Sequence, residues 1–122
     1  MDNMINYHLV WCTKRKKPVL VDDVERRLRE LFLNFAQTKG IEILTMDIQP
    51  NCVYLYVSTG SRIAPHDLVL GFKKSAYQPL RSDFPELKKM PSLWTDNYLA
   101  TTGKRISRRR ADRFIKSEGQ GR

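Results

Sequence analysis

Runs of positive charge are the residues whose chemistry is clearest in this 122-residue sequence. Residues 14–17 are four consecutive cations, and residues 108–110 are three consecutive arginines. A protein face that is merely solvated usually mixes charges of both signs, which these runs do not. With the formal net charge of +9, they predict a surface that binds the phosphates of a nucleic acid.

The arginine run stands at the start of a helix that we expect over residues 107–117. Cations at that end oppose the helix dipole unless an anion offsets them, which fits a bound phosphate. No pattern in the sequence indicates readout of particular bases. The predicted nucleic-acid-binding residues are Lys14, Arg15, Lys16, Lys17, Lys73, Lys74, Lys104, Arg105, Arg108, Arg109, Arg110 and Arg113.

Alternating and helical patterns of apolar residues predict the elements that must position these cations. Strands are expected at residues 5–12, 41–48, 52–57 and 93–101, and the second changes phase after Ile43 as an inserted bulge would cause. A helix should run from Asp22, with Asp22 and Glu25 as a capping box, to Gly40. A second helix carries Leu68, Phe72 and Ala76 on one face and should end or kink at Pro79.

The expected order is strand, helix, strand, strand, helix, strand, followed by the helix over residues 107–117 and a loose tail at 119–122. This order predicts an α+β protein with the ferredoxin-like βαββαβ pattern, an antiparallel sheet with its helices on one face, plus an added C-terminal helix. The length fits one domain over residues 1–122.

Several strand residues have a structural and a functional interpretation. His8 is more typical of a hydrogen-bonded sheet residue than of a metal ligand, and Cys52 of a small buried hydrophobe. Tyr54 and Tyr56 would either stack on bases or pack under a helix, and packing is favoured. On the last helix, Phe114 is more typical of a core anchor than of a functional group.

Features of a membrane or secreted protein are absent from the sequence. No apolar run approaches the roughly 20 residues that cross a bilayer, and the N-terminus lacks the pattern of a signal peptide. We therefore expect a cytoplasmic protein with no membrane partner. In that reducing compartment Cys12 and Cys52 should be free thiols, and two cysteines alone do not make a structural zinc site.

Residues 7–20, YHLVWCTKRKKPVL, resemble the opening of the single-tyrosine transposases of the insertion-sequence 200/605 type. Residues 84–89 (FPELKK), 93–94 (LW) and 97–103 (NYLATTG) are similar to later segments of that family in the same order. The resemblance covers nearly the whole chain.

The resemblance also implies which positions would carry catalysis. The family holds a divalent metal such as magnesium or manganese with a His-hydrophobe-His pair on a strand, whose positions are occupied here by Cys52 and Tyr54. Its nucleophilic tyrosine on the last helix and a later glutamine are matched by Phe114 and Glu118. A neutral cysteine and tyrosine do not replace two imidazoles for such a metal, and phenylalanine has no hydroxyl to attack phosphorus. We therefore expect no functional catalytic residue, no bound metal and no other cofactor.

The sequence thus predicts a transposase-like homodimer that binds single-stranded or hairpin DNA and is catalytically inactive. Two alternatives stay open. One is an active DNA transposase with an unusual nucleophile. The other is an RNA-binding regulator, because basic ferredoxin-like sheets with exposed aromatic residues also suit single-stranded RNA.

Overall fold

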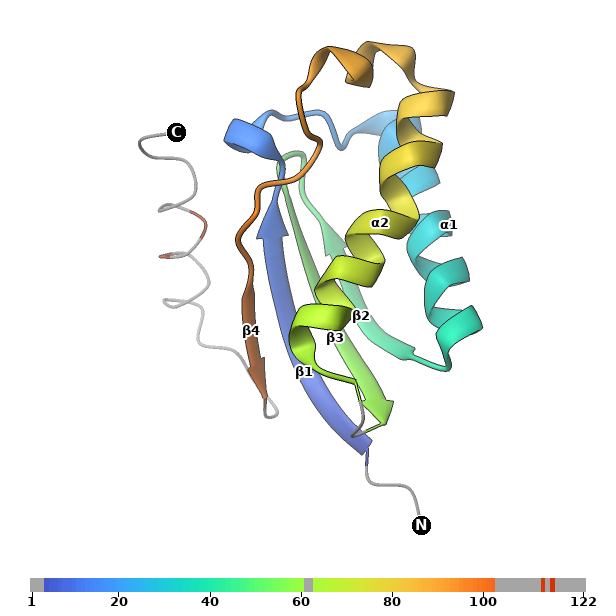
Figure 1. Cartoon of the computed structure of the whole chain (residues 1–122), viewed down its shortest axis with the longest axis vertical. Helices are drawn as coiled ribbons and strands as arrows, with labels where there is room; N and C mark the ends of the chain where they lie inside the picture. The colour runs from blue at the N-terminus through green and yellow to red at the C-terminus, as the bar shows by residue number, and fades with distance from the viewer. Residues whose placement is uncertain (1–3, 61–62, 103–112, 114, 116–122) are drawn as a thin grey trace.

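A computed structural model of the chain describes residues 4–60, 63–102, 113 and 115. In these residues a four-stranded antiparallel sheet has the order β2-β3-β1-β4, and α1 and α2 cover one of its faces (Figure 1). The elements are β1 (Met4–Cys12), η1 (Lys14–Lys16), α1 (Asp22–Lys39), β2 (Glu42–Ile48), β3 (Cys52–Gly60), α2 (Pro65–Asp83), η2 (Pro85–Lys89) and β4 (Leu99–Thr102). The predicted ferredoxin-like α+β fold is confirmed.

The end of the chain is described at two positions. Of the helix expected over residues 107–117, Arg113 and Ile115 are described, and both are helical. The tail expected at residues 119–122 lies outside the described residues. Within the described part of the chain, no helix is both long enough and apolar enough to cross a membrane.

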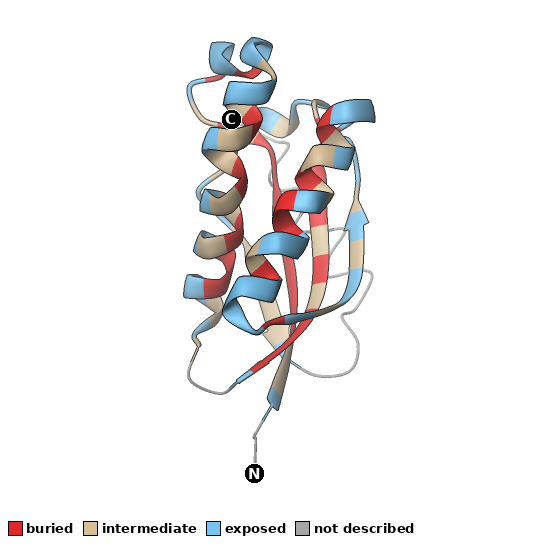
Figure 2. Ribbon diagram, turned by 90° about the vertical axis from the view of Figure 1, so that its right-hand side faces the viewer, coloured by how far each residue is buried: buried red, intermediate tan, exposed pale blue. Residues whose placement is uncertain are grey.

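The hydrophobic core lies between the two helices and the sheet, where the buried stripes of α1 and α2 face the strands (Figure 2). Leu9 on β1 and Leu55 on β3 are directly opposite each other and fully buried, as the alternation of β1 and β3 predicts. Phe32 of α1 and Phe72 of α2 meet edge to face beneath the sheet, with ring centroids 5.3 Å apart. This apolar layer holds both helices on the same side of the sheet.

The strand β2 contains the bulge that its apolar phase predicts. Its register against β3 shifts between Ile43 and Thr45, which leaves Leu44 outside the ladder and 43% exposed. The shift lets Ile43 and Met46 both pack against the core.

The start of α1 differs from the predicted capping box. Val21 occupies the N-cap with no side-chain cap hydrogen bond, and Asp22 has a φ of 52°. A capping residue has extended backbone, so Asp22 is unable to act as one. Glu25 instead accepts a hydrogen bond from Arg29 Nη2 at 2.6 Å. At the other end Gly40 has a φ of 69° and closes the helix as predicted.

The helix α2 continues past Pro79 to Asp83, so of the two outcomes predicted for Pro79, an end or a kink, the end does not occur. Tertiary contacts hold the extra turn. Leu80 is fully buried, and the Arg81 guanidinium donates to Tyr77 Oη at 2.6 Å and to the Met90 carbonyl at 3.4 Å.

The fourth strand is shorter than predicted, because residues 93–98 precede β4 rather than belong to it. Trp94 is buried and makes a single bridge to Thr13, while its Nε1 donates to the Lys73 carbonyl at 3.2 Å. The segment is therefore attached to α2 instead of continuing the ladder.

Cys12 and Cys52 form a disulfide, which corrects the prediction of free thiols. A reducing compartment favours free thiols, but the register of the strands aligns these two residues. The two residues are direct partners across β1 and β3, and both are buried. The pairing of the strands therefore brings the sulfurs together.

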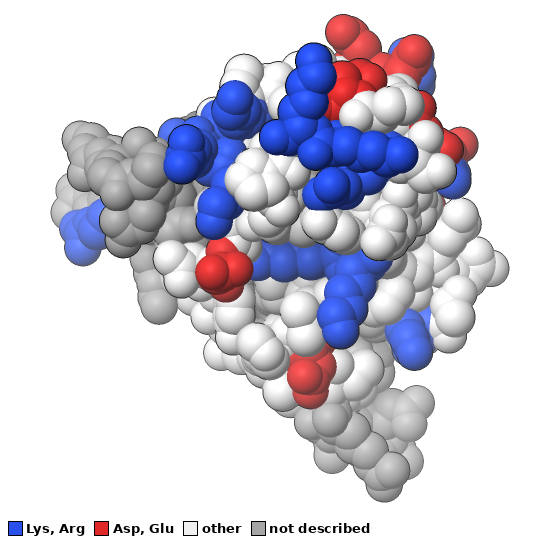
Figure 3. All heavy atoms as spheres, turned by 45° about the horizontal axis from the view of Figure 1, so that its top comes forward, with Lys and Arg blue, Asp and Glu red and all other residues white. Residues whose placement is uncertain are grey.

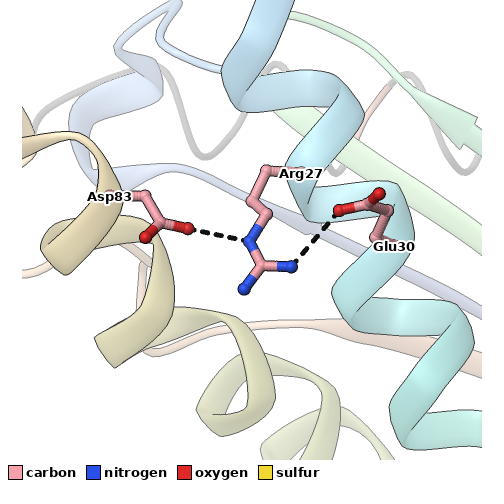
Figure 4. Close-up of polar contacts among 3 residues, drawn as sticks. All are labelled: Arg27, Glu30 and Asp83. Carbon is pink, nitrogen blue, oxygen red and sulfur yellow. Dashed lines mark hydrogen bonds and ion pairs between the residues drawn. The ribbon is translucent and has the colours of Figure 1, made fainter.

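An ion pair joins the two helices at their exposed edge. Arg27 Nε of α1 donates to Asp83 Oδ2 of α2 at 2.8 Å, and Arg27 Nη1 donates to Glu30 Oε1 at 3.2 Å (Figure 4). The hydrogen bond to Asp83, and then the bond to Glu30, raise the pKa of the Arg27 guanidinium. Both ends of the interhelical pair are partly exposed, at 37% and 44%.

Core packing should therefore contribute more to stability than this ion pair. Phe72→Ala is expected to lower the free energy of unfolding by about 3–5 kcal/mol, because it removes a fully buried ring. Asp83→Ala should lower it by less than about 1 kcal/mol, because exposed ion pairs are screened by water and salt. Urea unfolding of both variants measures the difference. Equal losses would mean that the ion pair, and not the core, holds the helices together.

Candidate nucleic-acid interface

The predicted cationic run at residues 14–17 forms a tight turn, η1, directly after β1. Thr13 precedes the turn and is fully buried. Its Oγ1 donates to the Lys17 carbonyl at 2.7 Å and to the Asn51 carbonyl at 3.3 Å, and its amide also donates to Asn51, at 2.9 Å. Thr13 therefore fastens both ends of the turn to the β2–β3 connection.

The backbone of η1 is unusual for its residue types. Arg15 and Lys16 have φ values of 55° and 53°, in the left-handed region that side chains other than glycine rarely adopt. Each such residue costs on the order of 1–3 kcal/mol and persists only where its surroundings determine it. The hydrogen bonds of Thr13 hold the turn in this conformation. The Lys14 amide also donates to the Leu93 carbonyl, at 2.9 Å. The turn thus presents the exposed side chains of Arg15 and Lys17 from a fixed backbone.

Lys88 and Lys89 are two further cations, absent from the residues predicted to bind nucleic acid. They lie on η2, are exposed, and occur at the same end of the molecule as η1 (Figure 1). Figure 3 looks onto this end, where Lys and Arg side chains gather. We name Arg15, Lys17, Lys88 and Lys89 the basic end. The sequence shows them as two adjacent lysines between Pro85 and Pro91, in a segment whose prolines predict irregular polar structure.

The two predicted lysines on α2 have different surroundings. Lys73 Nζ donates to the Thr95 carbonyl at 2.6 Å and to the Asn97 carbonyl at 3.4 Å, so its ammonium group holds the segment before β4. Lys74 is exposed and lines a cavity of about 450 Å³ between α2 and residues 92–96. Both lysines thus lie on α2 beside the segment that precedes β4.

The remaining predicted cations are mostly outside the described residues. These are Lys104, Arg105, Arg108, Arg109 and Arg110. Arg113 is helical and exposed.

The arginines of α1 differ from the cations of the basic end in their ion pairs. Arg26, Arg27 and Arg29 of α1 each pair with a carboxylate of α1 or α2. Among the described residues, no ion pair involves the basic end. The charge of these three arginines is therefore locally offset, whereas the basic end keeps a field that attracts polyanions.

The sheet face opposite the helices carries a second cluster of functional side chains. His8 lies directly opposite Tyr56 on β3, with the two rings stacked at a centroid distance of 4.2 Å. Tyr54 Oη lies 2.7 Å from His8 Nδ1, and Asn6 Nδ2 donates to Tyr56 Oη at 3.1 Å. Tyr54 and Tyr56 do not pack under α1 or α2, because Val53, Leu55 and Val57 take the side of β3 that faces these helices.

Burial raises the pKa of the Tyr54 phenol, and the neighbouring Tyr56 adds to the rise. The phenol therefore stays protonated and donates its hydrogen to His8 Nδ1 in the tautomer that carries the imidazole proton on Nε2. His8 is 2% exposed, in agreement with its interpretation as a hydrogen-bonded sheet residue.

The positions assigned to catalysis by resemblance divide between described and undescribed residues. The sulfur of Cys52 is in a disulfide with Cys12, and the phenol of Tyr54 is hydrogen bonded to His8. Neither side chain is therefore available as an anionic ligand. In the described part of the chain, no three His, Cys, Asp or Glu side chains gather as a metal site. Phe114 and Glu118 lie outside the described residues.

Comparison with known proteins agrees with the fold. The family described as "Transposase IS200 like" matches residues 2–118. The ISDra2 transposase TnpA of Deinococcus radiodurans is 29% identical over 117 residues, which are 93% of this chain and 84% of that protein. A crystal structure from Deinococcus radiodurans R1, described as that of a transposase, has a TM-score of 0.88 at 27% identity and covers 97% of this chain and 93% of its own.

A more distant solved structure shares the fold at 9% identity. It is a REP-associated tyrosine transposase bound to a REP hairpin, with a TM-score of 0.63 over 98% of this chain and 71% of that one.

The bond between Tyr54 and His8 predicts a pH-dependent effect on stability. Tyr54→Phe should lower the free energy of unfolding by about 1 kcal/mol at neutral pH, because the phenol bond to His8 is lost. The folded pKa of Tyr54 is raised, so this stabilisation is complete below the unfolded value of about 10 and disappears as pH rises through the folded value. Urea unfolding at several pH values should show the two proteins converging in alkali.

Tyr98→Phe is the control for this experiment, since the Tyr98 phenol has no hydrogen bond within the described residues. A difference between wild type and Tyr54→Phe that stays constant to high pH would contradict the role given to the Tyr54 phenol.

Proposed function

The chain belongs to the IS200-like transposase family, and we propose that it binds single-stranded or hairpin DNA through its basic end without cleaving the strand. The observation that carries this proposal is the rigid turn η1, whose exposed cations have no carboxylate partner among the described residues. A polyanion supplies the missing partner.

The turn is suited to phosphate binding because little of it needs to become ordered. Its backbone is already fixed by Thr13 and by the Lys14–Leu93 hydrogen bond. Ordering the interface on binding typically costs about 0.5–1.5 kcal/mol for each flexible side chain, and a flexible loop adds the cost of ordering its backbone. The fixed backbone of η1 avoids this second cost. A transposase of the same fold bound to a REP hairpin supports DNA as the class of ligand.

Loss of cleavage is the second part of the proposal. The residues present do not fit the divalent metal of the family, because the Cys52 sulfur is in a disulfide and the Tyr54 phenol is protonated and hydrogen bonded. Magnesium and manganese prefer charged oxygen ligands or imidazoles, and these positions offer neither. Phe114, at the position that matches the nucleophile, has no hydroxyl. We propose that the protein acts as a binder, as a homodimer, and without a bound metal.

A second candidate function rests on the contact between Tyr54 and His8. A tyrosine hydroxyl 2.7 Å from an imidazole nitrogen has the geometry of a nucleophile with its general base. In such a step Tyr54 Oη forms a bond to phosphorus while its proton passes to His8 Nδ1, and the bond from phosphorus to a sugar oxygen breaks. The sugar oxygen then takes up the proton held by His8 and leaves as a hydroxyl. The raised pKa of the Tyr54 phenol opposes this step, which is why binding is the preferred function.

Hairpin binding without covalent adducts is the expected outcome for the wild-type protein. The protein is incubated with end-labelled DNA hairpins and magnesium, manganese or zinc, with and without a thiol reductant, and is analysed on native and denaturing gels. Retarded complexes should form, and no labelled DNA should stay attached after denaturation. An unstructured strand and an RNA hairpin of the same sequence are the comparators. Failure to prefer the DNA hairpin over both would contradict the proposal.

Covalent adducts would instead favour the second candidate and can be assigned to one residue. If Tyr54 is the nucleophile, Tyr54→Phe should abolish the adduct while hairpin affinity stays within about twofold of wild type. Tyr98→Phe removes a phenol outside this cluster and should keep the adduct. Persistence of the adduct in Tyr54→Phe would exclude Tyr54 as the nucleophile.

A further inference from the structure

Two basic turns occur at the same end of the molecule although they are far apart in sequence. The turn η1 carries Arg15 and is followed directly by Lys17, and η2 carries Lys88 and Lys89 after α2 (Figure 1). All four side chains are exposed. The basic end therefore has two cationic arms on separate segments of the chain.

Hydrogen bonds hold the two arms in a fixed relation. The Lys14 amide donates to the Leu93 carbonyl at 2.9 Å, and the Thr95 amide donates to the Cys12 carbonyl at 3.1 Å. At the other end of the same segment, the Met90 amide donates to Leu87 of η2 at 3.1 Å, and the Met90 carbonyl accepts from Arg81. Residues 90–95 thus connect the two arms through backbone bonds rather than through flexible side chains.

The basic end lacks the groups that bind unpaired bases. Proteins that bind single strands combine cations with exposed aromatic rings on which the bases stack. No Phe, Tyr or Trp side chain of the described residues is exposed, and the two tryptophans, Trp11 and Trp94, are buried. Cations without aromatic surfaces suit a ligand whose bases are already stacked within a duplex.

We infer that η1 and η2 are the two arms of a clamp that binds the phosphates of a duplex DNA stem, with Lys88 and Lys89 forming the second arm. This inference rests on the proposed function and specifies which part of the hairpin the basic end contacts. Lys73, which fastens Thr95 and Asn97 to α2, is a positioning residue of the clamp.

The salt dependence of hairpin binding tests the second arm. Each phosphate contact to duplex DNA contributes about 0.9 to the slope of log affinity against log salt concentration. Lys88→Ala/Lys89→Ala should reduce the magnitude of that slope by about 2 for a DNA hairpin. Raising the salt from about 50 to about 200 mM should then weaken wild type roughly tenfold more than the variant. The affinity for an unstructured strand of equal length should change less than twofold.

Matched variants separate a local contact from an effect of net charge. Lys39→Ala removes one exposed lysine at the far end of α1 and should leave the hairpin slope unchanged, whereas Lys88→Ala alone should lower it by about 1. Unfolding curves confirm that the variants, all at exposed positions, are folded.

The outcomes distinguish this inference from the proposed function. A wild-type protein that does not bind the hairpin overturns both. Hairpin binding by wild type with an unchanged slope in Lys88→Ala/Lys89→Ala overturns the clamp alone. An equal loss of affinity for hairpin and unstructured strand also overturns it, because η2 would then contact single-stranded DNA.

Discussion

The strand β1 lies inside the sheet, between β3 and β4, and both candidate surfaces depend on this pairing. Tyr7, Leu9 and Trp11 point to the helices and enter the core, so the residues between them must face the other way. This places His8 opposite Tyr56 and Cys12 opposite Cys52. Where the ladder ends, Thr13 is buried and turns the chain into η1. A slip of one residue in this strand would exchange the two faces and remove both surfaces.

Electrostatics then decides which of the two surfaces suits a polyanion. On α1 each of Arg26, Arg27 and Arg29 lies beside a carboxylate, and such exposed pairs contribute little to stability and little to the distant field. The basic end has no such partners among the described residues. Its field extends over about one Debye length, roughly 8 Å at physiological salt, which is enough to attract a phosphate backbone to the turns. The sheet face has a protonated phenol and an imidazole, and its chemistry is that of hydrogen bonding and stacking.

Patterns that depend on local spacing were predicted from the sequence. The alternation of β1 and β3, the bulge after Ile43 and the left-handed Gly40 follow from neighbouring residues, and the structure confirms them. Features that depend on register or on distant packing were not predicted. The Cys12–Cys52 disulfide needs the alignment of two strands, and the position of Tyr54 on the face away from the core depends on α1 and α2 packing on the same side of the sheet. The same limit applies to Lys88. Its position at the same end of the molecule as η1 depends on the backbone hydrogen bonds of residues 90–95, which the residues next to Lys88 in sequence do not predict.

The backbone of η1 connects stability to function in this protein. Two left-handed residues of types that disfavour that conformation, Arg15 and Lys16, together cost on the order of 2–6 kcal/mol, against a typical net stability of about 5–15 kcal/mol. The buried Thr13 and its hydrogen bonds to Lys17 and Asn51 offset part of this cost, so the turn is stable only while β1 and the β2–β3 connection are in place. A relaxed turn would allow the same charges to move independently, and binding would then have to order each long side chain and its backbone. The backbone strain is thus the cost of holding the cations of η1 in one geometry. Because the sheet maintains that geometry, binding by η1 depends on an intact sheet.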